Sequence, residues 1–438
     1  NGEPGMIWLD RVNRDHTTPH LGLITATNPC VAEGTLVNTP QGFVPVESVK
    51  VGDYISTLDG SERVDSIEVH PEQPVFRVCF SDGGEQVVTA AHRYCSIKKG
   101  SHSKQVGIVP LSELQPGDYV RVEPTPVNVG GPSWEIGVKT GTLLGNGCYT
   151  PRQLEVHDLV KIGSGQQYPL HNSRIKQLFG EELFTKDSPA TDGSQSVSLA
   201  MRRGTAIGLL EEVGLHPAYG PEKTFDITSV RSQEHVMGLL DGLLSTDGSI
   251  NLRSNHPQIR FFTTSQALAL NIRRLLLMVG CHGGVTESFG ASGSIGGRQI
   301  ERRHTKYTVT VSGASAGAFA RQSRLSEIHP EKGILLRNLR RAWMTTGNTW
   351  KVQVKSITPF GCARVYDLHC GGSDTWITDG YVQRGCGEQP LMSQESCTLG
   401  SINLRNFVVV DSSAGAASDS KASDSELDSA LDWTRFGQ

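Results

Sequence analysis

The 438-residue sequence lacks several features that would assign it to a class at once. It has no apolar run near the roughly 20 residues that a membrane-spanning helix needs, and it does not open with the pattern of a secretory signal. Its nine cysteines form no Cys-x-x-Cys pair, which argues against a paired zinc site and a disulfide framework. We therefore expect a cytoplasmic protein with free cysteines and no membrane partner.

What the chain does contain is an ordinary globular composition, with 37% hydrophobic and 20% charged residues and a net charge of −4. A chain of this length predicts two to four structural units. The charge is uneven, because residues 131–341 carry 24 Lys and Arg against 18 Asp and Glu. This excess is a weak indication of nucleic-acid contact, and a solvated surface explains it about as well.

Strand-and-turn patterns occupy both ends of the central region. From Cys30 to about residue 130, and again over 348–385, short apolar runs alternate with Gly, Pro and Asp, which predicts strands and tight turns. The string Val51-Gly52-Asp53-Tyr54-Ile55 recurs as Pro116-Gly117-Asp118-Tyr119-Val120. The repeat predicts a pseudo-symmetric β-fold, with two similar turns by chance as the alternative.

The residues between these stretches follow a different pattern. Apolar residues at helical spacing over 236–244 and 268–279 predict helices, and the alternation at 307–311 predicts a strand. The middle of the chain is therefore expected to be an α+β insert within a β-rich frame.

The most informative feature is an interrupted motif. Asn28-Pro29 stands directly before Cys30, and Cys386-Gly387-Glu388-Gln389-Pro390-Leu391 begins far downstream. Without residues 30–385 the chain reads Asn-Pro-Cys-Gly-Glu-Gln-Pro-Leu, followed shortly by Glu395-Ser396-Cys397. The rejoined string resembles the active-site segment of ribonucleotide reductases, most like the adenosylcobalamin-dependent class. Because self-splicing requires a nucleophile at each junction, the inserted block resembles an intein.

The reductase resemblance implies roles for host residues after splicing. Cys386 would carry the radical that attacks ribose, assisted by Asn28 and Glu388, and Cys397 would be one of two cysteines that deliver reducing equivalents. Adenosylcobalamin would be the cofactor of the complete enzyme. The two host segments, 1–29 and 386–438, are too short for a catalytic barrel or a cobalamin site, so we expect no reductase activity from this chain.

Two motifs carry the resemblance to inteins at the upstream junction. Cys30-Val31-Ala32-Glu33-Gly34-Thr35-Leu36-Val37 resembles the first intein block, and Thr89-Ala90-Ala91-His92 resembles the Thr-x-x-His block that assists it. The resemblance implies that Cys30 attacks the preceding carbonyl and that Thr89 holds the peptide by hydrogen bonding. His92 would protonate the departing amine, a task suited to a side chain that titrates near neutrality.

A third motif resembles the penultimate intein block. It is Arg364-Val365-Tyr366-Asp367-Leu368, and it implies that Asp367 tunes the Cys30 thiolate and steers acyl transfer to Cys386. A surface aspartate beside a strand is the alternative.

The downstream junction departs from the intein pattern. Inteins usually close with His-Asn before the acceptor, and the Asn side chain cyclises to release the product; here Arg384 and Gly385 stand in those places. Glycine has no side chain to cyclise, so full splicing is expected to fail, whether Gly385 is engineered or natural. Thioester formation at Cys30 does not use Gly385 and is expected to survive.

The insert resembles a second family as well. Leu239-Leu240-Asp241-Gly242-Leu243-Leu244-Ser245-Thr246-Asp247-Gly248 resembles the helix motif of LAGLIDADG homing endonucleases, and Gly141-Thr142-Leu143-Leu144-Gly145-Asn146-Gly147 resembles a shorter copy. Small residues let two such helices pack closely, and acidic residues at their ends would bind Mg²⁺ at double-stranded DNA. Asp247 supplies one acid, but Asn146 replaces the other, so we expect weak or absent cleavage.

The sequence therefore predicts a mainly β Hint (Hedgehog/intein) splicing domain, residues 30–130 and 336–385, interrupted by an α+β LAGLIDADG endonuclease domain at 131–335. The splicing domain would act on its own flanking segments, 1–29 and 386–438. A site-specific DNA-binding or DNA-cleaving protein on an inert β-scaffold is the main alternative. A reductase fragment with an inert insertion is the third.

Overall fold

The computed structural model describes residues 30–384, with gaps at 98–106, 128–129, 165–168, 190–194, 253–256, 290–292, 296–297, 301–303, 343–349 and 371–374. By its contacts the chain divides into two units, and all described residues belong to the first, Asn1–Trp8 with Ala26–Glu388. The predicted site residues Asn28, Gly385, Cys386, Glu388 and Cys397 lie outside the described residues. No described helix is long and apolar enough to cross a membrane.

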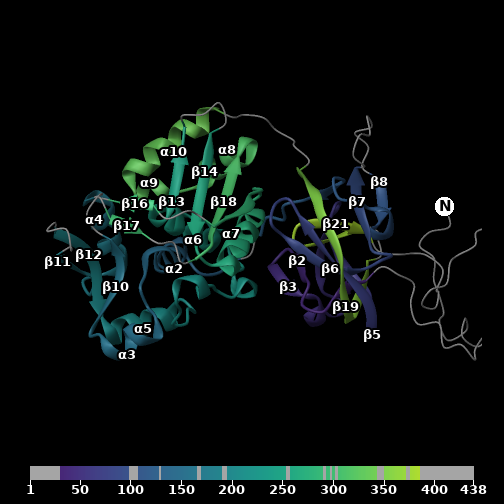
Figure 1. Cartoon of the computed structure of the whole chain (residues 1–438), viewed down its shortest axis with the longest axis horizontal. Helices are drawn as coiled ribbons and strands as arrows, with labels where there is room; N and C mark the ends of the chain where they lie inside the picture. The colour runs from purple at the N-terminus through teal and green to yellow at the C-terminus, as the bar shows by residue number, and fades with distance from the viewer. Residues whose placement is uncertain are drawn as a thin grey trace, which may run out of the picture. The chain divides into compact units, whose positions relative to one another are not determined.

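Residues from the two ends of the described range form a sheet of twelve described strands, coloured purple to blue and yellow-green in Figure 1. Its order is β3-β2-β20-β21-β7-β9-β19-β1-β6-β5-β4, with β8 beside β7, and its described pairings are antiparallel. The strands are β1 Val31–Ala32, β2 Leu36–Thr39, β3 Gly42–Pro45, β4 Tyr54–Thr57, β5 Gly60–Phe80, β6 Glu85–Thr89, β7 Arg93–Ile97, β8 Gly107–Pro110, β9 Tyr119–Val122, β19 Trp350–Cys370, β20 Thr375–Thr378 and β21 Tyr381–Arg384.

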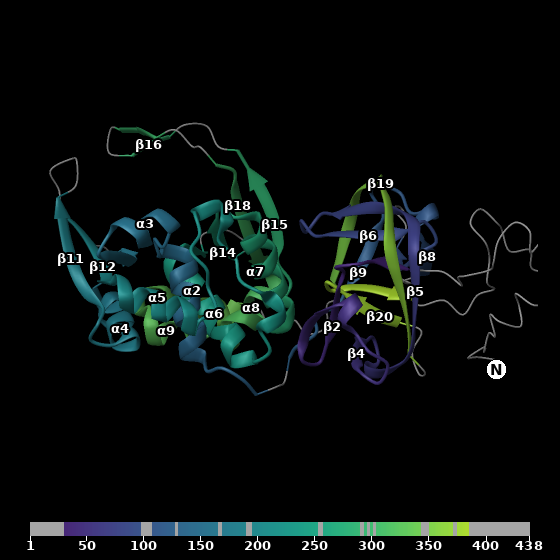
Figure 2. The ribbon, with the colours of Figure 1, turned by 90° about the horizontal axis from the view of Figure 1, so that it is seen from below.

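Two of these strands are far longer than the short apolar runs predict. β5 and β19 each extend over 21 residues and pair with each other, side by side in Figure 2. Their register shifts at four points, between Val354 and Ser356 among others. Bulges of this kind bend a strand and increase its twist. They also interrupt the alternation of apolar and polar residues, so the sequence pattern of one continuous strand resembles that of several short strands.

The two copies of the internal repeat form the same local turn. In each copy the aspartate side chain accepts a hydrogen bond from the amide three residues earlier, at 2.8 Å for Asp53 and 3.0 Å for Asp118. The residue before each aspartate then donates its amide to a long strand, to the carbonyl of Val64 in β5 or of Val354 in β19. The two copies therefore start β4 and β9 in the same way, and the pseudo-symmetric β-fold stays a prediction.

The middle of the chain contains helices and smaller antiparallel sheets, ordered β10-β12-β11, β13-β14-β18-β15 and β16-β17. The helices are α2 Trp134–Asn146, α3 Pro151–Val156, α4 Pro169–Phe179, α5 Arg203–Glu212, α6 Gln233–Thr246, α7 Gln266–Met278, α8 Gly313–Gln322, α9 Leu325–Ile328 and α10 Pro330–Ala342. The strands are β10 Leu159–Ser164, β11 Phe184–Pro189, β12 Gln195–Arg202, β13 Gly248–Asn251, β14 Gln258–Thr263, β15 Gly284–Ser288, β16 Gly293–Ile295, β17 Arg298–Ile300 and β18 Lys306–Ser312.

The helices predicted over 236–244 and 268–279 and the strand at 307–311 are confirmed as α6, α7 and β18. The predicted boundary at residue 335 falls inside α10, whose buried Leu336 and Leu339 join the same hydrophobic core as α2 and α6. Because the helix continues across residue 335 and packs into this core on the far side of it, we assign α10 to the inserted region.

Helices α2 and α6 pack against each other closely through glycines on both sides (Figure 1). A Cβ atom at Gly141 would overlap the carbonyl oxygen of Leu239, and one at Gly238 would overlap that of Trp134. A Cβ at Gly242 would lie 2.5 Å from the carbonyl oxygen of Val138. Only hydrogen fits in these gaps, so the glycines set the distance between the two helix backbones.

This packing predicts that Gly141→Ala destabilises the protein by about 1–3 kcal/mol, because the added methyl group must push the two helices apart. Gly208→Ala is the matched control, since a Cβ atom added at Gly208, in α5, would have no neighbouring atom within 4 Å. That control should gain about 0.5–1 kcal/mol from helix propensity. Urea unfolding of both variants measures the difference, and equal midpoints would contradict the close approach.

Candidate functional site

Cys30 lies at the centre of the large sheet, immediately before β1, and is 2% exposed. Strand β1 pairs with β6 on one side and with β19 on the other, both in antiparallel register. The register brings Cys30 beside Thr89, the last residue of β6, and opposite Asp367 in β19. The fold therefore gathers three predicted site residues from distant parts of the sequence.

Thr89 contacts the backbone of Cys30 through hydrogen bonds in both directions. Its hydroxyl oxygen accepts from the Cys30 amide at 3.2 Å, and its own amide donates to the Cys30 carbonyl at 3.1 Å. The Cys30 amide nitrogen is the nitrogen of the peptide bond that joins Pro29 to Cys30. A planar amide resists attack because of its resonance. The hydrogen bond to Thr89 fixes the nitrogen atom of this amide in place.

His92 is completely buried next to the same peptide, with its ring edge-on to Tyr94 at a centroid distance of 4.8 Å. Burial lowers the pKa of His92 to about 3, and the nearby backbone of Cys30 opposes this shift. Neither ring nitrogen makes a regular hydrogen bond to a described residue. The expectation that His92 titrates near neutrality is wrong, because desolvation disfavours the imidazolium, and His92 is neutral at pH 7.

Asp367 is 1% exposed, which excludes the alternative of a surface aspartate. Burial, together with the neighbouring carboxylate of Glu68, raises the pKa of Asp367 well above its ordinary value. His369 Nε2 lies 3.5 Å from one of its oxygens. A carboxyl group in such surroundings retains its proton to a higher pH than an exposed one and can therefore act as a proton donor.

Arg384, the last described residue, ends β21 and pairs with Arg93 in β7. Arg93 directly follows His92 in the sequence. The last described residue before the downstream junction therefore pairs with the residue that follows His92. Gly385 and Cys386 lie outside the described residues, so the position of the acceptor thiol stays a prediction.

Asn146 and Asp247 occupy equivalent places at the ends of the paired helices. Asn146 is the last residue of α2, and Asp247 is the C-cap of α6. Burial raises the pKa of Asp247, and the ammonium groups of Lys223, Lys332 and Lys161 oppose that shift. The two positions that the helix motif predicts therefore both lie at the C-terminal ends of the paired helices, but one carries an amide and the other a carboxylate.

Two lysines at these helix ends were not identified from the sequence. Each places its ammonium group on the carbonyl oxygens that close one helix of the pair, and burial lowers the pKa of each to about 8, opposed by Asp247. Lys223 donates to the carbonyls of Leu143, Leu144, Gly145 and Gly147 at 2.7–3.3 Å, and Lys332 donates to those of Leu244, Ser245, Thr246 and Gly248 at 2.8–3.2 Å.

A sequence signal for these lysines exists. The tripeptide Pro-Glu-Lys occurs as Pro221-Glu222-Lys223 and as Pro330-Glu331-Lys332, once after each helix motif. Terminal helix carbonyls carry partial negative charge and attract cations. The repeated tripeptide therefore marks the two-fold relation of the helices more clearly than the helix motifs themselves.

The residues at the helix ends are a poor match for a magnesium site. Mg²⁺ prefers several oxygen ligands, usually carboxylates, whereas one carboxylate and one amide are present here among three lysines. Within the described ranges, no cluster of three or more His, Cys, Asp or Glu side chains could hold a metal. We therefore derive no metal-dependent step at this site.

The sequence matches the family described as the ribonucleotide reductase barrel domain over residues 1–437. The chain belongs to this family. It is also 20% identical, over 93% of its length, to the ribonucleoside-diphosphate reductase NrdEB subunit alpha of Bacillus subtilis (strain 168) and of Bacillus phage SPbeta. The chain spans 42% of the length of these reductase subunits.

Among solved structures, the chain is similar to the MchDnaB-1 intein, with 33% identity over 21% of this chain and 66% of that one and a TM-score of 0.18. It is also similar to the Ssp DnaB mini-intein variant M86, with 8% identity over 83% of this chain and 96% of that one and a TM-score of 0.29. Both TM-scores are below 0.5, so the site is interpreted below from its own contacts.

The buried neutral state of His92 predicts a pH-dependent loss of stability. Between its ordinary pKa of 6.5 and its folded value of about 3, the unfolded chain binds a proton at His92 that the folded chain does not. The free energy of unfolding therefore falls as the pH is lowered, by about 1.4 kcal/mol per pH unit at most.

Chemical denaturation of the parent and of His92→Phe at a series of pH values tests this contribution. The difference between the two proteins should change across the interval, whereas His157→Phe, at an exposed position, should follow the parent. Parallel curves for the parent and His92→Phe would show that His92 titrates alike in the folded and unfolded chains.

Proposed function

We propose that residues 30–385 are an intein that performs the first two acyl transfers of protein splicing on its own flanking segments and stops before release. The observation that carries this proposal is the hydrogen bond from the Cys30 amide to the Thr89 hydroxyl, at 3.2 Å, within a buried site that also contains His92 and Asp367. A structural cysteine needs no such set of polar groups around its backbone.

In the first step, the Cys30 thiol attacks the carbonyl carbon of Pro29. A carbon–sulfur bond forms, the carbon–nitrogen bond of the peptide breaks, and the proton lost by sulfur is gained by the amine of Cys30. His92 is buried beside the same peptide, and we assign it the transfer of this proton from the sulfur to the departing nitrogen. Because burial disfavours the imidazolium, His92 holds the proton only transiently. Thr89 holds that nitrogen in place throughout.

In the second step, the Cys386 thiol attacks the thioester carbonyl. A new carbon–sulfur bond to Cys386 forms, and the bond to Cys30 breaks. The Cys30 sulfur leaves as a thiolate and needs a proton, which Asp367 is suited to give because its pKa is raised. The proton lost by Cys386 returns the carboxyl group to its starting state, so the step balances.

The third step of splicing stops at Gly385. Release requires an asparagine side chain to attack its own backbone carbonyl, and glycine has none. The product of the second step, a branched thioester at Cys386, is therefore the end point that we propose for this chain.

The proposal predicts that the full chain, incubated with a small thiol such as dithiothreitol, yields a fragment of residues 1–29, detected by intact-mass spectrometry. Cys30→Ala should abolish this product, and His92→Ala should slow it by about 100-fold or more because proton transfer is lost. Cys362→Ala is the matched control, since Cys362 is an exposed free cysteine. An unchanged mass in the parent under all conditions, and also after Gly385→Asn, would refute splicing and favour an inert insertion.

A second function is favoured by the paired helices, α2 and α6, with their equivalent ends. We propose that the inserted region binds double-stranded DNA as a homing-endonuclease domain, in which Asn146 has weakened cleavage. The glycine-mediated contact and the two lysine-capped ends support a two-fold site, and the basic excess of residues 131–341 supports contact with phosphates. The cofactor Mg²⁺ follows from the family resemblance alone.

Asn146→Asp would supply the second carboxylate that the parent site lacks. The DNA proposal therefore predicts that this variant gains cleavage, in Mg²⁺ buffer, of a duplex that spans the uninterrupted host gene at the insertion point, while the parent binds the same duplex with little cleavage. Gel-shift and nicking assays measure the two activities. The control is Asn172→Asp, on a separate helix of the same region. Absence of both binding and cleavage in both proteins would restrict the function to splicing.

The activity of the complete host enzyme is a further proposal. We infer that the spliced product would be part of a ribonucleotide reductase, with adenosylcobalamin as the cofactor that the motif resemblance implies. Both host segments lie outside the described residues.

A further inference from the structure

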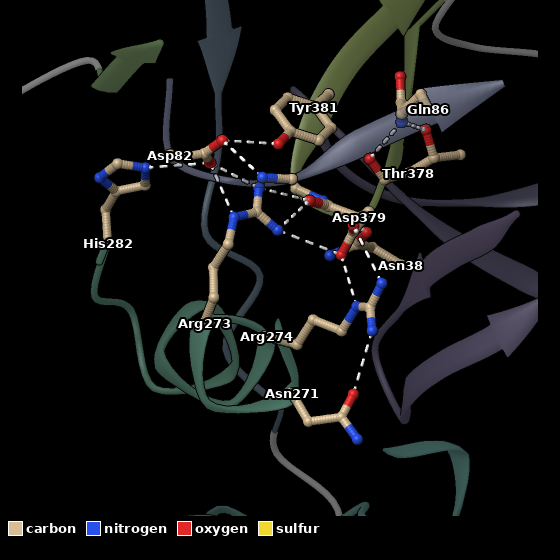
Figure 3. Close-up of polar contacts among 12 residues, drawn as sticks. Asn38, Asp82, Gln86, Asn271, Arg273, Arg274, His282, Thr378, Asp379 and Tyr381 are labelled. Atoms are coloured by element: carbon tan, nitrogen blue, oxygen red, sulfur yellow. Dashed lines mark hydrogen bonds and ion pairs between the residues drawn. The ribbon is translucent and has the colours of Figure 1, made fainter. Parts of the chain in front are cut away.

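One buried arginine of the inserted region joins two turns of the large sheet. Arg273, in α7, is 0% exposed. Its Nε donates to the carboxylate of Asp82 at 2.7 Å, and its terminal nitrogens donate to the backbone carbonyl of Asp379 at 3.1 and 3.2 Å. Figure 3 shows its guanidinium between these two aspartates.

The neighbouring Arg274 contacts only one of the two turns. Its guanidinium donates to both carboxylate oxygens of Asp379, at 2.8 and 3.3 Å, and to the side chain of Asn271 at 3.0 Å. Figure 3 shows Arg274 directed toward Asp379 and away from Asp82. Arg273 therefore contacts both turns and Arg274 contacts one, so mutation of each arginine can separate their effects.

Each of these turns leads to one side of the splicing site. Asp82 lies between β5 and β6, and β6 ends at Thr89, which holds the Cys30 amide. Asp379 lies between β20 and β21, and β21 ends at Arg384, directly before the downstream junction. Arg273 thus connects the hairpin of the first junction with the hairpin of the second.

The second turn is a two-residue hairpin loop with a defined backbone shape. Asp379, with a φ of +48°, is the one residue other than glycine with positive φ in the described ranges, and Gly380 follows with a φ of +86°. Thr378 pairs with Tyr381, so these two residues form the whole hairpin loop. Positive φ at both loop positions is typical of a type I′ turn, in which Asp-Gly is a preferred pair.

The sheet supplies the acids and the inserted region supplies the balancing cations. Asp82 is 2% exposed and Asp379 is 5% exposed. Arg273 and His282, from the inserted region, hold the pKa of Asp82 well below its ordinary value despite its burial. The Tyr381 hydroxyl also donates to Asp82 at 2.8 Å. A buried carboxylate that loses its cation is strongly destabilised, so the two turns depend on α7.

We propose that Arg273 and Arg274 are positioning residues for splicing, through which the inserted region aligns the two junctions. The inference rests on the proposed splicing function. Only the four residues of β21 separate the turn at Asp379 from the downstream junction, so a shift of this turn changes where the paired strand β21 delivers that junction. A shift of the turn at Asp82 is transmitted along β6 to Thr89.

Two assays on the full chain separate the two junctions. Thiol-induced release of residues 1–29 in a Cys386→Ala background reports the first junction alone. The branched thioester, in a background with Cys386 intact, reports the second; peptide mapping after pepsin digestion at low pH detects it as the residues before Cys30 joined to Cys386. Far-UV circular dichroism and the melting midpoint report folding of each variant.

Arg273→Met is expected to slow both reactions by tenfold or more, because it leaves Asp82 without its arginine. Arg274→Met is expected to lower the branched thioester by a similar factor and to leave thiol-induced release within twofold of the parent. Arg337→Met, at an exposed position of α10, should change neither. A general loss of structure would slow both reactions in Arg274→Met as well, and that result would overturn the proposal.

Charge removal provides the rescue. In the double variant Arg273→Met and Asp82→Asn, the turn at Asp82 no longer holds a buried carboxylate without its arginine, and Arg274 still pairs with Asp379, so both reactions should recover most of the parent rate. Folded Arg273→Met and Arg274→Met proteins with parent rates in both assays would overturn the positioning role while leaving splicing intact. Absence of thiol-induced release in the parent itself would instead refute the splicing proposal.

Discussion

The pairing of β1 between β6 and β19 is the constraint on which the rest of this site depends. Two residues long, β1 could not hold a position by its own hydrogen bonds. Because it is paired on both sides in the middle of a large sheet, Cys30 is buried, and its amide faces the hydroxyl of Thr89. His92 and Asp367 are buried in the same sheet, which lowers the pKa of His92 and raises the pKa of Asp367.

Burial also explains how one chain can carry two unrelated sites. The large sheet and the helical region each have a main hydrophobic cluster, and each contributes a buried side chain to the other, Leu277 of α7 to the sheet cluster and Phe43 of β3 to the helical one. Each region also has a local near-symmetry. In the sheet the near-symmetry lies in the turns at Asp53 and Asp118, and in the insert it lies in the lysine-capped ends of α2 and α6. Where the two regions meet, Arg273 and Arg274 of the helical region form ion pairs with Asp82 and Asp379 of the sheet (Figure 3). The helical region is therefore bonded directly to the sheet.

Membership in the ribonucleotide reductase family and the interrupted Asn-Pro/Cys-Gly-Glu motif agree with each other, since both identify the host. Much of the fold could also be predicted: helices α6 and α7, strand β18 and the repeated turns follow from periodicity and turn residues. The length of β5 and β19 could not, because bulges break the alternation that identifies a strand. The end of the inserted region at α10 was misplaced for a similar reason, as the pattern of a helix does not say which core it joins.

The sequence by itself determined the covalent possibilities. In the splicing reaction that we propose, cysteines at both junctions permit acyl transfer, and Gly385 prevents release, because a reaction that needs a side chain cannot occur without one. The tertiary structure alone decided the electrostatics. It determines which groups are buried deeply enough to change their pKa, which lysines bind the carbonyl groups at the helix ends, and which arginines neutralise Asp82 and Asp379. Those properties arise from contacts between residues far apart in the chain, such as Arg273 with Asp82, and desolvation exists only once the chain has folded around them.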